Sequence, residues 1–280
     1  MIETSNETEL LGAARGGDAA AFGRLVQPHL TKVRGVVRRM VGHPEEVDDL
    51  VQQTLLNAHL GLGTFRGDSA VGTWLCAIGA RLALDHLRTR KRWRERAQSV
   101  FAAACLESEA LGTEVGAALN DPSFTYSVNE HIAYCFTCIG RTLDPEEHAA
   151  LVLRDVLDLS TEQAAQALGV SRSVLKHHLA SGRNRMQGSY EGLCALVSKQ
   201  GACWQCSGLR QAAPEGSRGP EVPACLDWAE RLRRIREAAL DGGKAAPLHD
   251  GVFRHTHEQE EAGRGDPSAT TDCGHPDTED

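Results

Sequence analysis

The sequence predicts an all-α fold: two small helical domains joined by a linker and followed by a partly disordered C-terminal tail. Three observations lead to this prediction. Only 5% of the 280 residues are aromatic, while the good helix formers Ala, Leu, Arg and Glu are abundant. Apolar residues recur with helical spacing through most of residues 1–190. Gly, Pro and capping residues then divide these apolar stretches into separate helices.

Residues 1–96 are predicted to form a bundle of four helices. The first helix stops at Gly16 and Gly17, and Asp18 is placed to cap the second, because an Asp side chain accepts hydrogen bonds from the free amides of a helix N-terminus. Pro44 opens the third helix, since proline is favoured at a first helical position. Four helices with short connections favour one compact unit.

Two parts of this front domain carry polar side chains that a helical core does not need. The third helix has an apolar stripe and a polar opposite face, and the fourth, from about residue 69 to 90, ends in a basic run. The polar face holds Asp48, Asp49, Gln52 and Gln53, and the basic run includes Arg88, Arg90, Lys91 and Arg92. Each set is also compatible with a solvated surface that binds nothing.

A second helical domain is predicted over residues 129–190, after a linker over residues 97–128 with room for one short helix. Ser160 begins a capping box, and Gly169 ends the helix that follows. Ser171 then caps a last helix that runs to about residue 186. Helix, glycine turn and helix within about 25 residues is the pattern of a helix-turn-helix.

Residues 191–280 are predicted to form a Cys-containing C-terminal extension that is mostly flexible. A Pro- and Gly-rich break at residues 213–223 precedes a helix expected over about 226–240. The last 35 or so residues are polar and acidic, and we expect them to be disordered.

The formal net charge of −8 is unevenly distributed. Residues 24–96 hold 13 Lys and Arg against seven Asp and Glu, whereas residues 207–280 hold nine against 15. This asymmetry favours a body that meets nucleic acid and a tail that does not. No apolar run approaches the roughly 18 residues that span a bilayer, and the first ten residues are polar, so we expect a cytoplasmic protein without membrane contact.

The nine cysteines of a cytoplasmic chain indicate thiols or metal ligands rather than disulfides. Cys135 with Cys138, and Cys203 with Cys206, each have the spacing of half a zinc knuckle. A four-thiolate zinc site from these pairs would pin the tail onto the second domain. Alternatively, Cys135 and Cys138 are small core residues one helical turn apart. No other cofactor is expected.

Three segments of the front domain resemble, in order and spacing, the promoter-melting domain of extracytoplasmic-function (ECF) sigma factors, a subfamily of the bacterial sigma-70 family. They are TELLGAARGGD with the following Phe22, VDDLVQQT at residues 47–54, and FRGDS at 65–69 with TWL at 73–75. LVLR at residues 151–154 and LGVS at 168–171 are similar to the family's promoter-binding helix-turn-helix. The resemblance implies a transcription initiation factor without catalysis. Its implied partners are core RNA polymerase, promoter DNA and an anti-sigma factor.

The resemblance also implies roles for particular side chains. A loop would hold an unstacked base of the minus-ten element, and the basic helix end would lie on phosphates. The polar face of the third helix would dock on the clamp helices of the polymerase's largest subunit, although the family usually has Glu where Gln53 stands. The loop residues are Phe65, Arg66, Asp68 and Ser69, and the residues implied for the minus-thirty-five element are Arg172, Ser173, Lys176, His177 and Arg183.

Some of these side chains also have a purely structural alternative role. Phe65 would simply pack under the bundle, and Asp68 or Ser69 would cap the next helix. In the recognition helix, Val174, Leu175 and Leu179 are expected to pack inward.

Two other functions fit parts of the chain. A stand-alone helix-turn-helix regulator explains residues 141–186 but leaves the front motifs unused. A dithiol oxidoreductase needs strand and helix around a CxxC pair, and the sequence has no strand pattern near either pair. For a sigma factor, we hypothesise that the extension regulates activity in cis, with thiolate chemistry as the switch.

Overall fold

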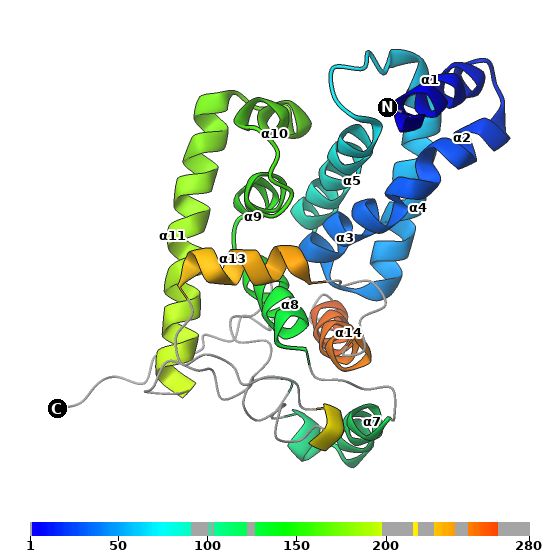
Figure 1. Ribbon diagram of the computed structural model, residues 1–280. Coiled ribbons are helices and arrows are strands. Elements are labelled where there is room, and N and C mark those ends of the chain that lie inside the picture. Colours follow the sequence, from blue (N-terminus) through cyan, green and yellow to red (C-terminus); the bar gives the residue numbers. More distant parts are fainter. Residues whose placement is uncertain are drawn as a thin grey trace.

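The computed structural model describes residues 2–90, 101, 104–121, 127–197, 215–217, 227–238 and 246–262. Every regular element among these residues is helical (Figure 1). The predicted all-α class is therefore confirmed. Within the same residues, no helix is both long and apolar enough to cross a membrane.

The front domain follows the predicted plan with one break. Its elements are α1 (Ile2–Arg15), α2 (Ala19–Val26), η1 (Gln27–His29), α3 (Leu30–Val41), α4 (Pro44–Gly61), η2 (Leu62–Thr64) and α5 (Val71–Arg88). Asp18 caps α2 and accepts from the amides of Ala20 and Ala21 at 2.8 and 3.0 Å. The second predicted helix is divided into α2 and α3, because Pro28 tightens the chain into a 3₁₀ turn.

The second domain contains the predicted helix-turn-helix. Its elements are α8 (Val128–Gly140), α9 (Pro145–Leu151), the π-helical turn η3 (Val152–Val156), α10 (Thr161–Leu168) and α11 (Arg172–Val197). Ser160 and Gln163 form the reciprocal capping box at the start of α10, with bonds of 3.0 and 3.1 Å. Gly169 ends α10 in the left-handed region at φ +67°, which glycine adopts at little cost.

The linker and the extension are more helical than the sequence indicated. They contain α7 (Glu109–Asn120), η4 (Glu215–Ser217), α13 (Trp228–Glu237) and α14 (Ala246–Ala262). α13 lies where a helix was expected, but α14 contradicts the disorder expected over residues 246–262. Its Leu248, Val252, Phe253 and Thr256 are all buried on one face. The polar residues between them lowered the average hydrophobicity and hid this helical stripe.

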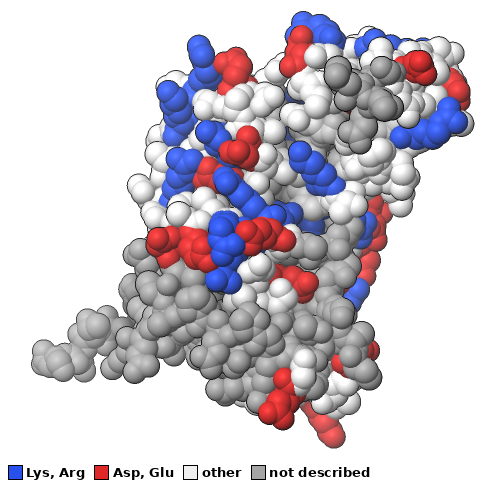
Figure 2. Space-filling model, in the orientation of Figure 1, with Lys and Arg blue, Asp and Glu red and all other residues white. Residues whose placement is uncertain are grey.

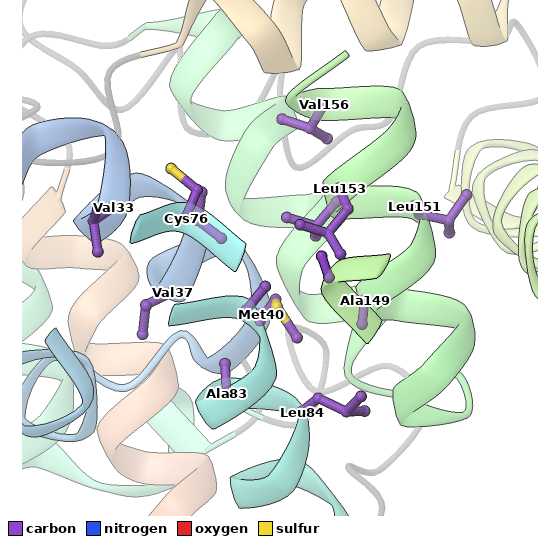
Figure 3. Packing of buried hydrophobic residues seen from close by; sticks show 14 of the residues in the cluster. Val33, Val37, Met40, Cys76, Ala83, Leu84, Ala149, Leu151, Leu153 and Val156 are labelled. Atoms are coloured by element: carbon purple, nitrogen blue, oxygen red, sulfur yellow. The ribbon is translucent and has the colours of Figure 1, made fainter. Parts of the chain in front are cut away.

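The two predicted domains share one continuous core instead of standing apart (Figure 3). Met40 of α3 and Leu84 of α5 belong to the same buried cluster as Ala149 of α9 and Leu153 of η3. α5 packs on α9 and α10, while α3 packs on α8. α13 crosses α8, and α14 lies against α4 and α7 (Figure 1). The helices of the extension are therefore part of the folded body.

Candidate nucleic-acid and protein interfaces

A hollow of about 500 Å³ opens beside the loop between α4 and α5, where the sequence predicted a base-binding site. Phe65 is only 7% exposed and packs on Trp74, with ring centroids 4.9 Å apart. Arg66 and Asp68 are exposed and form an ion pair of 3.0 Å. Ser69 also lines the hollow, so the structure brings the four predicted loop residues to one cavity.

The structure tests the structural roles that were the alternative for this loop, namely packing of Phe65 and capping of the next helix by Asp68 or Ser69. Phe65 does pack into the bundle, as the structural alternative predicted. The N-cap residue of α5 is Ala70, and it has no side-chain capping bond, so neither Asp68 nor Ser69 caps this helix. Phe65 therefore lines the hollow from within the bundle, and its contact with a base stays a prediction.

The opposite wall of the hollow comes from the helix-turn-helix domain. Gln163, Gln166 and Ala167 of α10 line it, together with Arg81 of α5. Arg81 donates from Nε to the Ala167 carbonyl at 3.1 Å, and from Nη2 to the carbonyls of Ala167 and Gln166 at 2.8 and 3.2 Å. The last carbonyls of a helix lack partners within the helix, so Arg81 satisfies two of them and ties α5 to α10.

The basic end of α5 is neutralised by carboxylates. Arg88 bonds to Asp85 and to Glu146 of α9, at 2.9 Å in each case. Arg90 pairs with Glu46 of α4 and lies 3.7 Å from Glu261 of α14. Both arginines are thus engaged by acids, Arg88 at an exposed position and Arg90 at a partly buried one. The other two members of the predicted basic run, Lys91 and Arg92, lie outside the described residues.

The carboxylate at the centre of this cluster is strongly held in its charged form. Burial by itself would raise the pKa of Glu46, but the hydrogen bond from His86 and the charges of His86 and Arg90 lower it to about 2. Its Oε1 also lies 3.0 Å from Nε2 of His257 on α14. Glu46 therefore joins α4, α5 and α14.

The start of α11 presents a polar face to solvent. The predicted base-reading residues Arg172, Ser173, Lys176 and His177 are all exposed, and Arg172 makes a surface ion pair of 3.3 Å with Glu162. Leu175 and Leu179 are buried as expected, but Val174 is 42% exposed, so its inward packing was wrong. Val174 is a further candidate contact, because apolar side chains meet thymine methyl groups. In the sequence, Val174 stands one helical turn before His177, and this spacing from a polar side chain was the signal for the exposed face.

Arg183 does not share this exposed face. Its guanidinium binds Asp155 of η3 in a fork, with bonds of 2.8 and 2.5 Å, and Asp155 is 4% exposed. A bidentate pair with a buried carboxylate holds α11 on η3. This pair gives Arg183 a structural role, and its DNA contact stays a prediction.

The polar face of α4 is open, as a docking surface requires. Asp48, Asp49, Gln52 and Gln53 are all exposed. Leu56 and Leu60 continue the same face at intervals of four residues and are 51% and 75% exposed. These two leucines were not among the predicted contact residues, although their spacing from Asp48 and Gln52 placed them away from the buried stripe. We call these six side chains the α4 face.

The cysteine prediction is only partly within the described residues. Cys138 is buried at 6% exposure on α8, and Cys135, one turn away, is partly buried. Cys203 and Cys206 lie outside the described residues. Across the part of the chain that the structure describes, no group of three or more His, Cys, Asp or Glu side chains is arranged to hold a metal ion. The four-thiolate zinc site therefore stays a prediction.

On the molecule's face in Figure 2, Lys and Arg side chains alternate with Asp and Glu, and no stripe of one sign is visible. This pattern agrees with the ion pairs that engage Arg88, Arg90 and Arg183. On this face, the positive charge that would attract DNA is interspersed with acidic side chains.

Comparison with known proteins matches both domains. Residues 25–93 match the model of Sigma-70 region 2, and residues 135–186 match that of Sigma-70, region 4. The chain is 30% identical to ECF RNA polymerase sigma factor SigM of Mycobacterium tuberculosis, over 65% of this chain and 83% of that protein. It is also 30% identical to RNA polymerase sigma factor NccH of Alcaligenes xylosoxydans xylosoxydans, over 66% of this chain and 95% of that protein.

A solved structure of CnrH in complex with the cytosolic domain of CnrY is 25% identical to the chain, with a TM-score of 0.41, over 65% of this chain and 96% of that one. The two family models match the front domain and the helix-turn-helix domain in the order that the sequence motifs predicted. The matched relatives are themselves named as sigma factors, and this chain spans most of their length. The chain therefore belongs to the ECF family of RNA polymerase sigma factors, which direct promoter-specific transcription initiation.

Proposed function

We propose that this sigma factor docks on core RNA polymerase through the α4 face, holds a base of the minus-ten element in the hollow beside Phe65, and contacts the minus-thirty-five element with the exposed start of α11. It performs no catalytic step of its own. The exposed α4 face carries the proposal, because a stand-alone operator-binding regulator has no use for it. Leu56 and Leu60, 51% and 75% exposed, are the side chains that a protein partner would cover.

The hollow suits a nucleobase in its chemistry. Phe65 and Trp74 offer aromatic surface, while Arg66, Asp68 and Ser69 offer polar groups for the edges of a base. Stacking on aromatic side chains contributes about 1–3 kcal/mol per base in single-strand binding. An unstacked base is the form that such a hollow accepts, which agrees with a role in opening the duplex.

The start of α11 suits the major groove. Lys176 and Arg172 can reach phosphates or guanine edges, Ser173 and His177 can bond to base edges, and Val174 can contact a thymine methyl. All five side chains are exposed on the first turns of the recognition helix. An anti-sigma partner, and zinc bound by the two CxxC pairs, remain predictions. For zinc, the check is the metal content of the reduced chain and of a Cys203→Ser, Cys206→Ser variant.

Transcription with purified core polymerase tests the proposal. Promoter-specific initiation should occur only when the chain is added. A Leu60→Arg variant should reduce core binding about tenfold or more, since it places a charge in an apolar contact. A Leu106→Arg variant, which changes an even more exposed leucine away from the α4 face, is the matched control and should behave like the wild type. Promoter binding that needs no core polymerase would favour the stand-alone regulator instead.

A further inference from the structure

Three carboxylates of α14 face three arginines of the body. Two of these arginines belong to the front domain and one to the helix-turn-helix domain, so a single helix of the extension spans both. Asp250 pairs with Arg38, Glu261 lies 3.7 Å from Arg90, and Glu260 lies 3.9 Å from Arg141. α14 therefore bridges the two domains by charge.

Aromatic packing fixes the same helix on both domains. Phe253 is fully buried, and its ring fills the space beside Gly42, where an added Cβ would come within 2.3 Å of it. His249 stacks on Tyr134 of α8, with ring centroids 4.0 Å apart and planes 15° apart. Only a residue without a side chain at position 42 allows this approach. α14 is thus packed as core, and not laid loosely on the surface.

α13 makes a second bridge. The buried side chain of Arg39 on α3 donates to the carbonyls of Ile235 and Ala238 at the end of α13, both at 2.9 Å. Arg236 of α13 donates to the carbonyl of Asp155 in η3 at 2.6 Å. Because the last carbonyls of a helix need outside partners, Arg39 closes the end of α13 as Arg81 closes the end of α10. The front domain and the helix-turn-helix domain are joined again through the extension.

This joined arrangement cannot span a promoter. By their names, the minus-ten and minus-thirty-five elements lie about 25 base pairs apart, which at about 3.4 Å per base pair is about 85 Å of B-form DNA. In the structure, by contrast, the predicted base-binding loop and α10 line the same hollow of about 500 Å³. The two DNA-contacting domains must separate before they can occupy both elements.

We propose that α13 and α14 are an internal latch that holds the front domain and the helix-turn-helix domain closed on one another until the chain opens. The inference rests on the proposed function, because closure is inhibitory only if both domains bind one promoter. Opening is a population shift, favoured by ligands that bind the open form alone. Core polymerase and promoter DNA are those ligands.

Matched single-charge variants of the full-length chain test the latch. Asp250→Asn removes the partner of the buried Arg38, whereas Glu258→Gln removes one charge from an exposed position of the same helix. Phe253→Ala weakens the latch by removing buried packing. Because it leaves the Arg38–Asp250 pair unchanged, it separates release of α14 from effects of an unpaired Arg38. Hydrogen–deuterium exchange over residues 246–262 reports on release of α14, and transcription with core polymerase at limiting chain concentration reports on activity.

We expect Asp250→Asn and Phe253→Ala to speed exchange in α14 and to raise transcription about fivefold or more, with Glu258→Gln unchanged in both. Adding core polymerase and promoter DNA to the wild type should also speed exchange in α14. Faster exchange without increased transcription would overturn the latch and leave the sigma function standing. No promoter-specific transcription from any variant, wild type included, would overturn the proposed function and the latch with it.

Discussion

At the scale of single residues, the structure separates arginines that hold the fold from side chains that face solvent. Arg183 and Arg172 both lie on α11 and were both predicted to contact DNA. Arg183 grips a buried carboxylate, while Arg172 has only an exposed ion pair with Glu162. Substitution of Arg183 should therefore lower stability, whereas substitution of Arg172 should weaken DNA binding.

Arg183→Ala should lower the free energy of unfolding by about 2 kcal/mol, because it leaves Asp155 buried without its partner. Arg172→Ala should change it by less than about 0.5 kcal/mol and instead weaken binding to the minus-thirty-five element. Urea unfolding and promoter binding by the holoenzyme measure the two effects. Equal stability of both variants would contradict the structural role of Arg183.

Two buried histidines make stability depend on pH. Burial and the charge of Arg141 lower the pKa of His148 from 6.5 to about 3, and burial with His131 and Arg38 lowers that of His249 well below 6.5. The unfolded chain takes up these protons below pH 6.5, but the folded chain does so only at much lower pH. The stability is therefore complete above pH 6.5 and is lost as the pH falls toward 3.

The expected slope is about 1.4 kcal/mol per pH unit for each histidine. Urea unfolding between about pH 7.5 and about pH 5 measures it, a range above that in which Glu46 titrates. His148→Leu should reduce the slope, and His177→Leu, at an exposed site, should leave it unchanged. A slope that is the same in all three chains would rule out His148 as a source.

At the scale of elements, helices with clear end signals were predictable and helices formed by distant contacts were not. The capping box at Ser160 and the left-handed conformation of Gly169 depend only on nearby residues, so α10 and the turn after it were predicted correctly from the sequence. α14 has few apolar residues, and its stability comes from Tyr134, Gly42 and three arginines far away in the chain. Tertiary partners of that kind are invisible to periodicity.

The same limit applies to the contact residues. The four polar side chains of the α4 face could be predicted, because polar side chains on one side of an amphipathic helix lie away from the core, but its two exposed leucines were missed. The engagement of Arg88 by Glu146 and of Arg183 by Asp155 could not, because these partners lie 58 and 28 residues away. A basic residue in a DNA-binding motif is thus weak evidence for a DNA contact.

The α4 face as an element makes its own prediction. Asp49→Lys and Gln52→Ala should weaken binding to core polymerase and leave the free energy of unfolding within about 0.5 kcal/mol of the wild type, because both side chains are exposed. Fluorescence titration with core polymerase, alongside urea unfolding, gives both values. A loss of stability that matched the loss of binding would show that the face belongs to the fold.

At the scale of the whole molecule, the joined domains predict a compact chain in solution. A folded chain of this length has a radius of gyration of about 19 Å when compact. Small-angle scattering should show a larger radius for Phe253→Ala than for the wild type, because the latch variant populates the open form. An Ala substitution of exposed Leu106 serves as the control and should scatter like the wild type.

The engagement of Arg38 and Arg39 by the extension has a practical consequence for work with shortened chains. Both side chains are almost fully buried, against Asp250 and the end of α13 respectively. A protein cut before residue 227 would carry two unmasked guanidinium groups on α3. Such a protein should copurify with nucleic acid and elute late from heparin, and its apparent DNA affinity would reflect this new cationic patch and not promoter recognition.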